Sequence, residues 1–233
     1  MAGSEIGLLS GLASTRAIRR YRDEPVPDDA LAQMLFAATR APSGSNRQPF
    51  RFMVLTDGPN ALAAKQLIGT TARRFWSEKR AADGYDDGSG ASQGSPKARM
   101  AAAMEQYVAN IELVPVLILP CLLRYRAPHS FEGASIYPAC QNLLLAARAL
   151  GFGGVLTGFH AAVEAELRTL LALPANAVIM ATITVGRPVG RHGPVRRLPL
   201  SDLVFADTWG TAPAWAVDPP GTLHTGAGPP RRH

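Results

Sequence analysis

The chain has 233 residues, of which 47% are apolar and 18% are charged, and its formal net charge is +6. This apolar content is sufficient for a packed core and excludes a chain that is disordered throughout. The longest apolar run, Val114 to Leu123, contains two prolines and is shorter than the ~20 residues of a membrane-spanning helix. Since the N-terminus also lacks a secretory-signal pattern, we expect a cytoplasmic protein without a membrane span.

Arginine carries most of the positive charge, because the chain has only three lysines. The guanidinium group binds phosphate and carboxylate groups through paired hydrogen bonds, so this composition favours a phosphorylated ligand. Nucleic acid is not expected as a partner, because the arginines are scattered and no basic helix, zinc-ligand pattern or aromatic platform accompanies them. Cys121 and Cys140 have no metal-binding or redox spacing, and we expect both to be reduced thiols in the core.

The first predicted element is a short helix over residues 5–12, and four arginines follow within seven residues of the segment Ser14–Arg22. Such a charge run is often a solvated basic face. However, Ile18 and Tyr21 are apolar partners that can hold part of the segment against a core. These two residues favour an ordered anion-binding site, and a solvated basic face is the alternative.

A polar loop, Ala41–Phe50, lies between a predicted helix that Asp28 can cap and an apolar strand over residues 51–56. Between two prolines, the loop carries several side chains that donate or accept hydrogen bonds: Ser43, Ser45, Asn46, Arg47 and Gln48. Such a cluster suits a flat ligand with polar edges, and we interpret the loop as the floor of a cofactor site. An ordinary connection between helix and strand is the alternative.

Two further helices are predicted over residues 59–79 and 97–112, and a buried strand follows over residues 114–119. Between the helices, residues 82–95 are rich in Gly, Ser and Asp, a composition typical of a mobile loop. A disordered linker and a lid over a pocket are both compatible with this composition. The apolar, foldable sequence on both sides favours the lid.

The longest helical pattern, Phe131–Gly151, is almost entirely apolar and predicts a buried central helix. It leads into Gly151–Gly158, where four glycines within eight residues would let the backbone turn sharply or approach a ligand closely. Their spacing matches neither a P-loop nor a dinucleotide fingerprint. A helix over residues 161–172 and a strand over residues 177–185 follow, and the Pro- and Gly-rich residues 218–233 predict a disordered tail.

Several motifs follow one another along the chain. They are Arg16-Ala-Ile-Arg19 with Tyr21 and Pro25-Val-Pro27, then Ala41–Phe50, then Gln141-Asn142 ahead of Leu150-Gly-Phe-Gly, and finally Arg197-Leu-Pro. Taken in this order, they resemble the signature of the nitroreductase family of FMN flavoproteins. The resemblance runs from about Arg16 to Leu203. We therefore expect one family domain over residues 1–217, with residues 82–95 as its mobile loop or lid.

The resemblance implies an α+β fold in which helices wrap a central mixed β-sheet. It also implies an obligate homodimer with two FMN sites at the interface, in which electrons from NADH or NADPH reduce a small nitroaromatic or quinone substrate. Apolar residues between Leu200 and Trp215 follow the last core strand and need a place of burial. We expect this segment to embrace the partner subunit.

The FMN contacts that the resemblance implies fall into four groups. The first group meets the phosphate and ribityl chain and comprises Arg16, Ala17 and Arg19, and the second is a late phosphate-binding cation, Arg197. The third group meets the pyrimidine edge and ribityl hydroxyls of FMN and comprises Ser43, Ser45, Asn46 and Gln48. The fourth is backbone that passes the ring near N5, at Thr157 and Gly158. Ser77 and Arg80 match a family Asn and Lys near the flavin edge.

Two positions depart from the family pattern. Ala17 stands where many members carry Ser, and Val195 stands where some carry Lys. One hydroxyl and one charge toward FMN are therefore missing or are supplied elsewhere. Arg196 is the candidate for the missing charge.

No side chain stands out as a catalytic acid, base or nucleophile, and no metal site is predicted. The five histidines form no Ser-His-Asp or metal-ligand constellation. A flavin would account for this absence, because the cofactor would carry the chemistry. The predicted function is an FMN-dependent NAD(P)H nitroreductase. The alternatives are a reductive dehalogenase or flavin-processing relative on the same fold, and a non-catalytic flavin-binding protein.

Overall fold

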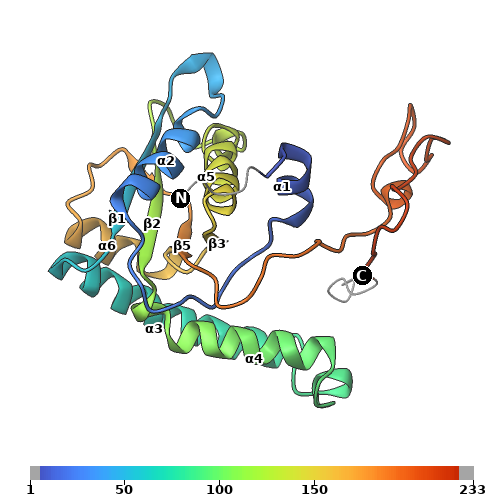
Figure 1. The fold of residues 1–233 in the computed structure, drawn as a ribbon. Coiled ribbons are helices and arrows are strands. Elements are labelled where there is room, and N and C mark those ends of the chain that lie inside the picture. The colour runs from blue at the N-terminus through green and yellow to red at the C-terminus, as the bar shows by residue number, and fades with distance from the viewer. Residues whose placement is uncertain (1–5, 226–233) are drawn as a thin grey trace. The chain divides into compact units, whose positions relative to one another are not determined.

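The computed structural model describes residues 6–225, and its contacts divide the chain into two compact units, Met1–His192 and Gly193–His233. Unit 1, the first of these, contains every α-helix and every strand of the described residues (Figure 1). The predicted domain of residues 1–217 and the predicted disordered tail of residues 218–233 stay predictions. Of that tail, residues 226–233 lie outside the described residues.

A five-stranded sheet forms the centre of unit 1, with strand order β1-β2-β5-β3 and with β4 also paired to β2. The strands are β1 (Phe50–Leu55), β2 (Val116–Leu123), β3 (Gly153–Thr157), β4 (Ala177–Ile179) and β5 (Thr182–Gly186). We predicted a mixed sheet, and all pairs of these strands run antiparallel. A parallel bridge joins Arg197 and His224 within the second unit.

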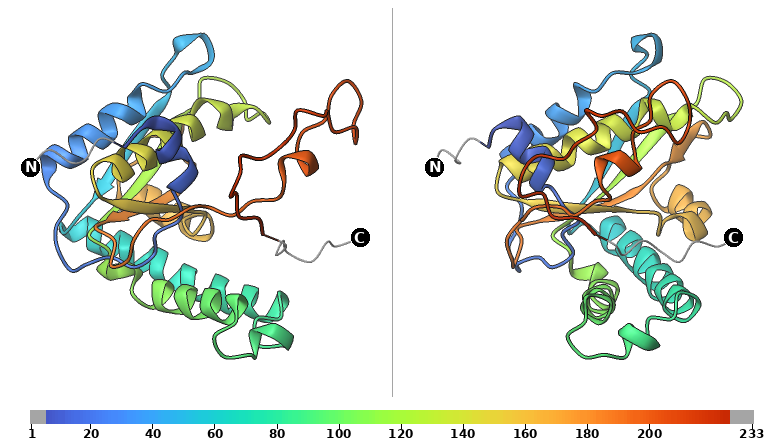
Figure 2. Two further views of the ribbon diagram at one scale, coloured as in Figure 1. Left: turned by 45° about the vertical axis from the view of Figure 1, so that its right-hand side comes forward. Right: turned by 90° about the vertical axis from the view of Figure 1, so that its right-hand side faces the viewer.

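Helices cover both faces of the sheet. They are α1 (Leu8–Ser14), α2 (Asp28–Thr39), α3 (Pro59–Ala82), α4 (Pro96–Ala109), α5 (Tyr137–Ala149) and α6 (Glu164–Leu170). Helices α2 and α5 pack on one face, and α3, α4 and α6 pack on the other (Figure 2). None of the helices within residues 6–225 combines the length and apolar character that a membrane crossing requires.

The strand β2 shows why this sheet has a continuous apolar run instead of an alternating pattern. Val116, Ile118 and Leu122 join the core under α2 and α5. Leu117, Leu119 and Cys121 join the core under α3, α4 and α6. Because both faces of the strand are buried, every position is apolar. The α+β class with helices around a central sheet is confirmed.

Pro120 explains two differences from the predicted strands. The predicted strand over residues 114–119 continues through Pro120 to Leu123. The single strand predicted over residues 177–185 is divided into β4 and β5, because the register on β2 shifts by one residue between Cys121↔Ile179 and Ile118↔Ile183. Proline has no N–H to donate to a ladder, and the bulge at Met180 and Ala181 lies opposite it.

Several helix ends also differ from the predictions. The central helix begins at Tyr137 and not at Phe131, with Pro138 in its first turn, where a missing N–H costs no hydrogen bond. Asp28 lies in the first turn of α2 and does not cap it, since Pro27 occupies the cap position. The first helix spans Leu8–Ser14 where residues 5–12 were predicted, and residue 5 lies outside the described residues. Residues 82–95 contain one short 3-10 helix, Gly88–Gly90, and their role as a lid stays a prediction.

A buried lysine ties α3 to the ends of two strands. Lys65 is only 3% exposed, and its ammonium donates to the carbonyl oxygens of Thr56 at 2.5 Å and Val114 at 2.7 Å. Burial lowers the pKa of Lys65, and the nearby Asp57 carboxylate opposes that shift. The ammonium therefore donates hydrogen bonds to backbone carbonyl groups that lie just beyond the ends of strands and are not paired within the sheet.

We expect Lys65→Met to destabilise the protein by about 1–3 kcal/mol, because it leaves the Thr56 and Val114 carbonyls without a donor inside the core. The measurement is denaturant unfolding at a fixed protein concentration. Lys79→Met is the matched control, since the Lys79 side chain is 50% exposed and its ion pair with Asp83 lies on the surface. An equal effect of the two substitutions would contradict this role of Lys65.

Candidate active site

The arginine-rich segment Arg16–Arg22 is an ordered strap over the edge of the sheet. The backbone N–H of Ile18 donates to the carbonyl oxygen of Gly154, and that of Arg22 donates to the carbonyl oxygen of Arg187. The Tyr21 hydroxyl lies 2.8 Å from the Thr184 hydroxyl, which lies 2.9 Å from the buried Tyr107 hydroxyl. Burial raises the pKa of Tyr21 well above its usual value and that of Tyr107 to about 12, so both phenols stay protonated.

Glycines in the sheet make room for this strap. A Cβ on Gly153 would lie 2.6 Å from the Ile18 side chain, and a Cβ on Gly186 would lie 2.8 Å from the Tyr21 ring. Real Cβ atoms essentially never approach so closely. We expected these glycines to serve a sharp turn or the close approach of a ligand; at Gly153 the group that approaches the backbone is the protein's own arginine segment.

The strap forms one wall of a groove of about 540 Å³ in unit 1. The other walls come from the first half of α4 and from the loop after β5. The lining residues are Arg16, Ala17, Ile18, Arg19, Arg20, Pro96, Arg99, Met100, Ala103, Pro188, Gly190 and Arg191. The predicted residues Arg16, Ala17 and Arg19 are therefore brought together, in a groove with five arginines.

The groove has an uncompensated positive charge. None of its five arginines forms an ion pair with an acidic side chain within the described residues. The Nε atom of Arg19 is buried and has no hydrogen-bond partner there. A buried N–H without an acceptor costs free energy, and an anionic ligand oxygen would supply the acceptor. The groove therefore suits a phosphate group.

The polar loop between α2 and β1 has an unusual backbone. Ser45, Asn46 and Gln48 have φ angles of 53°, 51° and 48°, in the left-handed region that favours glycine. Each such residue costs about 1 kcal/mol or more, although Asn tolerates the conformation better than most. Strain of this kind is typical of functional loops, where the surroundings hold the backbone in place. An ordinary helix-to-strand connection would not need it.

Neighbouring groups hold the loop in this conformation. The Ser43 hydroxyl accepts from the backbone N–H of Gln48 at 2.9 Å, and Arg51 donates to the Gln48 carbonyl oxygen at 3.0 Å. The Ser135 hydroxyl accepts from the backbone N–H of Gly44 at 3.3 Å. The side chains of Ser45, Asn46 and Gln48 remain exposed. The loop thus presents hydroxyl and amide groups outward from a fixed backbone.

Thr157 and Gly158 lie at the end of β3, which is an edge strand. The Thr157 hydroxyl donates to the Thr182 carbonyl oxygen at 3.3 Å, and a Cβ on Gly158 would meet no atom within 4 Å. Leu156 beside them is 40% exposed. The backbone there is open to a ligand, as the prediction requires.

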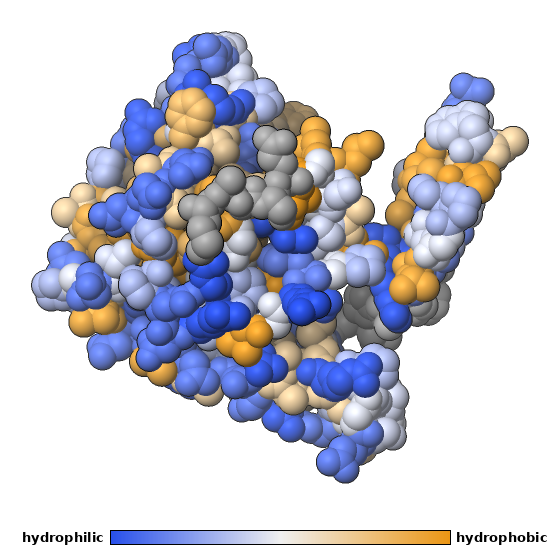
Figure 3. All heavy atoms as spheres, in the orientation of Figure 1, coloured by the Kyte–Doolittle hydropathy of each residue, from blue (hydrophilic) through white to orange (hydrophobic). Residues whose placement is uncertain are grey.

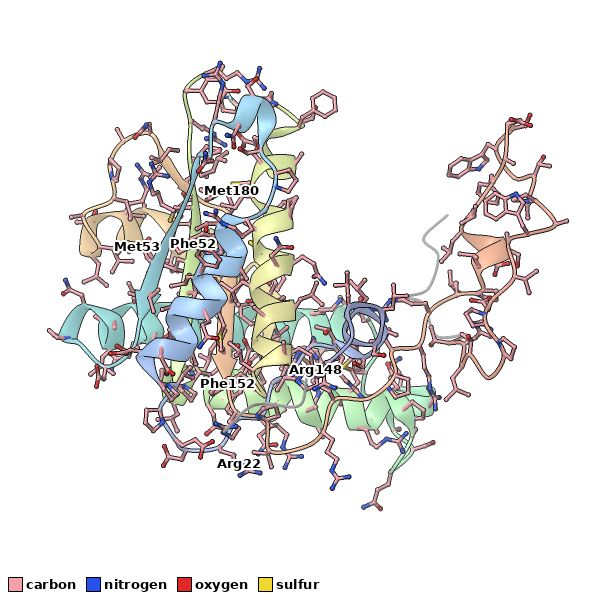
Figure 4. All side chains as sticks on the ribbon, turned by 45° about the horizontal axis from the view of Figure 1, so that its top comes forward. Arg22, Phe52, Met53, Arg148, Phe152 and Met180 are labelled. Carbon is pink, nitrogen blue, oxygen red and sulfur yellow. The ribbon has the colours of Figure 1, made fainter. Side chains whose placement is uncertain are left out.

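One chain does not assemble all the predicted groups at one place. The arginine strap and the polar loop lie at opposite ends of α2, as Figure 4 shows with Arg22 at one end of that helix. Twelve residues of helix span about 18 Å. Arg80 is paired with Asp86 and Glu105, and neither it nor Ser77 lines the groove. Arg196 and Arg197 belong to the second unit, and their role stays a prediction.

The structure adds candidate residues that the sequence did not indicate. Arg99 on α4 and Arg191 after β5 share the groove with Arg16 and Arg19. Arg99 lies in the helix predicted over residues 97–112, and an arginine on a surface helix is ordinarily on a solvated face. Only the crossing of α4 beneath the strap distinguishes it. Thr184 and Tyr107 are buried, and their hydroxyl groups form the hydrogen-bonded chain that holds Tyr21 of the strap. Nothing in the sequence pattern marked either residue as part of the site.

Two of the histidines are structural. His160 is 6% exposed, with its Nδ1 3.2 Å from the Thr182 hydroxyl, and His192 donates from Nε2 to the Phe152 carbonyl oxygen at 3.0 Å. Burial lowers the pKa of both from 6.5; Glu164 opposes the shift at His160, while Arg148 and Arg16 add to it at His192. Neither imidazole lines the arginine groove.

We expect the melting temperature to fall as the pH drops below 6.5, because the unfolded chain binds protons that the folded histidines resist. The stability contributed by the neutral imidazoles is present above that pH and is lost below it. Thermal melts of the wild type and of His160→Asn at pH 7 and pH 5 test this. The variant should show a smaller decrease, and an identical decrease would exclude His160 as a cause.

Comparison with known proteins identifies relatives of this chain. The family model described as "Nitroreductase family" matches residues 12–187. A protein of Thermus thermophilus named NADH dehydrogenase is 28% identical over 201 residues, which cover 82% of this chain and 91% of that protein. A 4-nitrobenzoate reductase of Nocardioides sp. is 28% identical over 196 residues, covering 76% and 78%. Among solved structures, a protein of Desulfovibrio desulfuricans assigned to the nitroreductases and crystallised in complex with FMN has a TM-score of 0.64 at 29% identity, covering 88% and 99%.

Proposed function

This chain belongs to the nitroreductase family, and we propose that it is an FMN-dependent oxidoreductase that transfers electrons from NADH or NADPH to nitroaromatic or quinone substrates. The observation that carries the proposal is the groove of five arginines, which have no acidic partner in the part of the chain that the structure describes and which suit the phosphate of FMN. The FMN-bound relative and the relative named for 4-nitrobenzoate support the cofactor and the substrate class.

The residues of the two half-sites have different tasks. Arg16 and Arg19 would bind the FMN phosphate, with Arg99 and Arg191 adding positive potential in the same groove. Ser45, Asn46 and Gln48 would donate to and accept from the polar edge of the flavin. The FMN held by these residues would supply the redox chemistry between the nicotinamide and the substrate. The protein then supplies binding, orientation and a positive potential, and no side chain has to act as acid or base.

We propose a homodimer in which the arginine groove of one chain and the polar loop of its partner form one FMN site. Support comes from the separation of the two half-sites along α2. Further support comes from apolar side chains left at the surface. On α1, Leu8 and Leu9 are 73% and 79% exposed, and hydrophobic side chains are visible over this helix in Figure 3. In the second unit, Trp209 and Trp215 are 90% and 70% exposed, and we propose that residues 200–215 embrace the partner.

The test is the absorption spectrum of the purified protein together with steady-state assays. We expect a yellow protein with flavin absorption that oxidises NADH or NADPH when a nitroaromatic or a quinone is present. Flavin binding without turnover of either substrate class would favour a non-catalytic carrier. Turnover of halogenated aromatics alone would favour a reductive dehalogenase. A colourless protein that binds no added FMN would contradict the proposal. We also propose a cytoplasmic location, which these assays do not test.

A further inference from the structure

A second cavity in unit 1 lies beside the polar loop and is separate from the arginine groove. Its volume is about 350 Å³, within the range of roughly 300–1,000 Å³ that small-molecule sites occupy. Pro42, Ser43 and Gly44 of the polar loop form one wall. The end of β2 and the chain from Arg124 to Ser135 form the others. No residue is shared with the lining of the arginine groove.

Aromatic side chains stand at this cavity with much of their surface uncovered. Tyr125 is 56% exposed and Phe131 is 77% exposed, and both line the cavity. The His129 ring lies 6.4 Å from the Phe131 ring, and its Nδ1 accepts from the Phe131 backbone N–H at 3.2 Å, which fixes the turn. Leu122, Pro42 and Pro49 complete apolar walls. A planar aromatic ligand could bury these surfaces by stacking.

The charges around the cavity do not balance. Arg124 is neutralised, since its Nε donates to the Glu132 carboxylate at 2.8 Å and the two groups form an ion pair. Arg126 lines the cavity and has no acidic partner within the described residues. Arg47 of the polar loop likewise has no acidic partner among the described residues. Both guanidinium groups lie over the Tyr125 ring, that of Arg126 at 5.3 Å and that of Arg47 at 4.5 Å from the ring centre. Two free cations therefore flank an aromatic-lined space.

From this arrangement we propose that the cavity binds an aromatic carboxylate, with the ring against Phe131 and the carboxylate paired with Arg126 and Arg47, which Tyr125 holds in place. Guanidinium groups bind carboxylates through paired hydrogen bonds, and their stacking on Tyr125 pre-orients them. A nucleotide phosphate is the weaker fit, because the richest cluster of unpaired arginines lies in the other groove. The inference rests on the proposed function, in which the polar loop faces the flavin, and it names nitroarenecarboxylates as the preferred substrate class.

The kinetic test compares 4-nitrobenzoate with nitrobenzene, two substrates that differ only in the carboxylate. We expect Arg126→Met to lower kcat/KM for 4-nitrobenzoate by at least about tenfold, the size of one lost charge-assisted contact, through KM. The value for nitrobenzene should change by less than about twofold, because no charge is lost from that complex. Arg74→Met is the matched control, since Arg74 lines a different groove on α3 and α6. Equal losses for both substrates would overturn the proposal.

A binding measurement tests the cavity without turnover. Calorimetric titration of the oxidised, FMN-loaded protein should detect benzoate and give a weaker signal for the uncharged benzamide. Arg126→Met should remove that difference, while Phe131→Ala should weaken both ligands. Equal affinity for benzoate and benzamide in the wild type would overturn the proposal. Benzoate binding by a protein that reduces neither nitroarenes nor quinones would instead uphold the cavity and contradict the proposed function.

Discussion

Arg19→Glu should leave the purified protein colourless. Among residues 6–225, the buried Nε of Arg19 has no hydrogen-bond partner, and the other arginines of its groove, Arg16, Arg20, Arg99 and Arg191, have no acidic partner. Charge reversal replaces an attractive contact to the FMN phosphate with repulsion, a change on the order of several kcal/mol. We expect the dissociation constant of FMN to rise by at least about a hundredfold, which corresponds to roughly 2.7 kcal/mol. Flavin fluorescence during titration of the apoprotein measures it.

Arg74→Glu is the control for this result, because it makes the same charge reversal on α3 in a different groove. It should retain the yellow colour and the wild-type affinity for FMN. The same measurement on Arg197→Glu examines the second unit, where the predicted late phosphate contact lies. If Arg19→Glu retained FMN as tightly as the control, the assignment of the phosphate to this groove would be wrong.

Two variants that are inactive alone should restore activity when they share a dimer. Arg19→Glu damages the arginine groove, and Asn46→Val damages the polar loop, where Asn46 has a φ of 51° that a β-branched residue does not adopt without strain. In a mixed dimer one site combines both defects, and the other combines an intact groove with an intact loop. Random pairing of the two chains should therefore give roughly a quarter of wild-type activity.

The control is a protein that carries both substitutions on every chain. It should stay inactive after mixing with itself, because each of its sites has both defects. Co-expression of the two single variants with different affinity tags isolates the mixed dimer for assay. No recovery in the mixed dimer would mean that a single chain supplies both half-sites, contrary to the separation of strap and loop along α2.

Local pattern determined most of the secondary structure. The apolar helical spacing before Pro42 corresponds to α2, and the apolar run from Val114 to Leu123 contains β2. These assignments depend on residues close together in the chain, and the sequence contains that information directly. The helix boundaries were predicted less accurately: α5 begins at Tyr137, whereas the pattern began at Phe131. A first helical turn is stabilised by few hydrogen bonds of its own, so its start is weakly marked in the sequence.

Only the tertiary structure decided which surfaces the functional residues share. No periodic pattern in the sequence marks Gly153 and Gly186 as positions that require glycine. The requirement arises because the strap crosses both positions and leaves no room for a Cβ atom. Arg99 is 80 residues or more from Arg16 in the chain, yet both line one groove because α4 crosses beneath the strap. Ser45 and Gln48 have left-handed φ angles, which residues other than glycine disfavour. The loop therefore depends on contacts with Arg51 and other neighbours to hold this backbone conformation.

The sequence by itself determined the identity of the polar loop as a cluster of donors and acceptors and the concentration of arginines in Arg16–Arg22. These two features follow from composition and spacing, which do not depend on distant parts of the chain. The α+β class was implied by the resemblance of the motifs to a known family. The tertiary structure decided that the arginines form a groove with α4 and that the loop lies at the other end of α2. It also left Arg126 without an acidic partner among the described residues, at the cavity that Phe131 lines. Burial and ion pairing depend on which residues are neighbours in space. Segments that are remote in the sequence become neighbours only when the chain packs, so their distances and charge balance cannot be obtained from the sequence pattern.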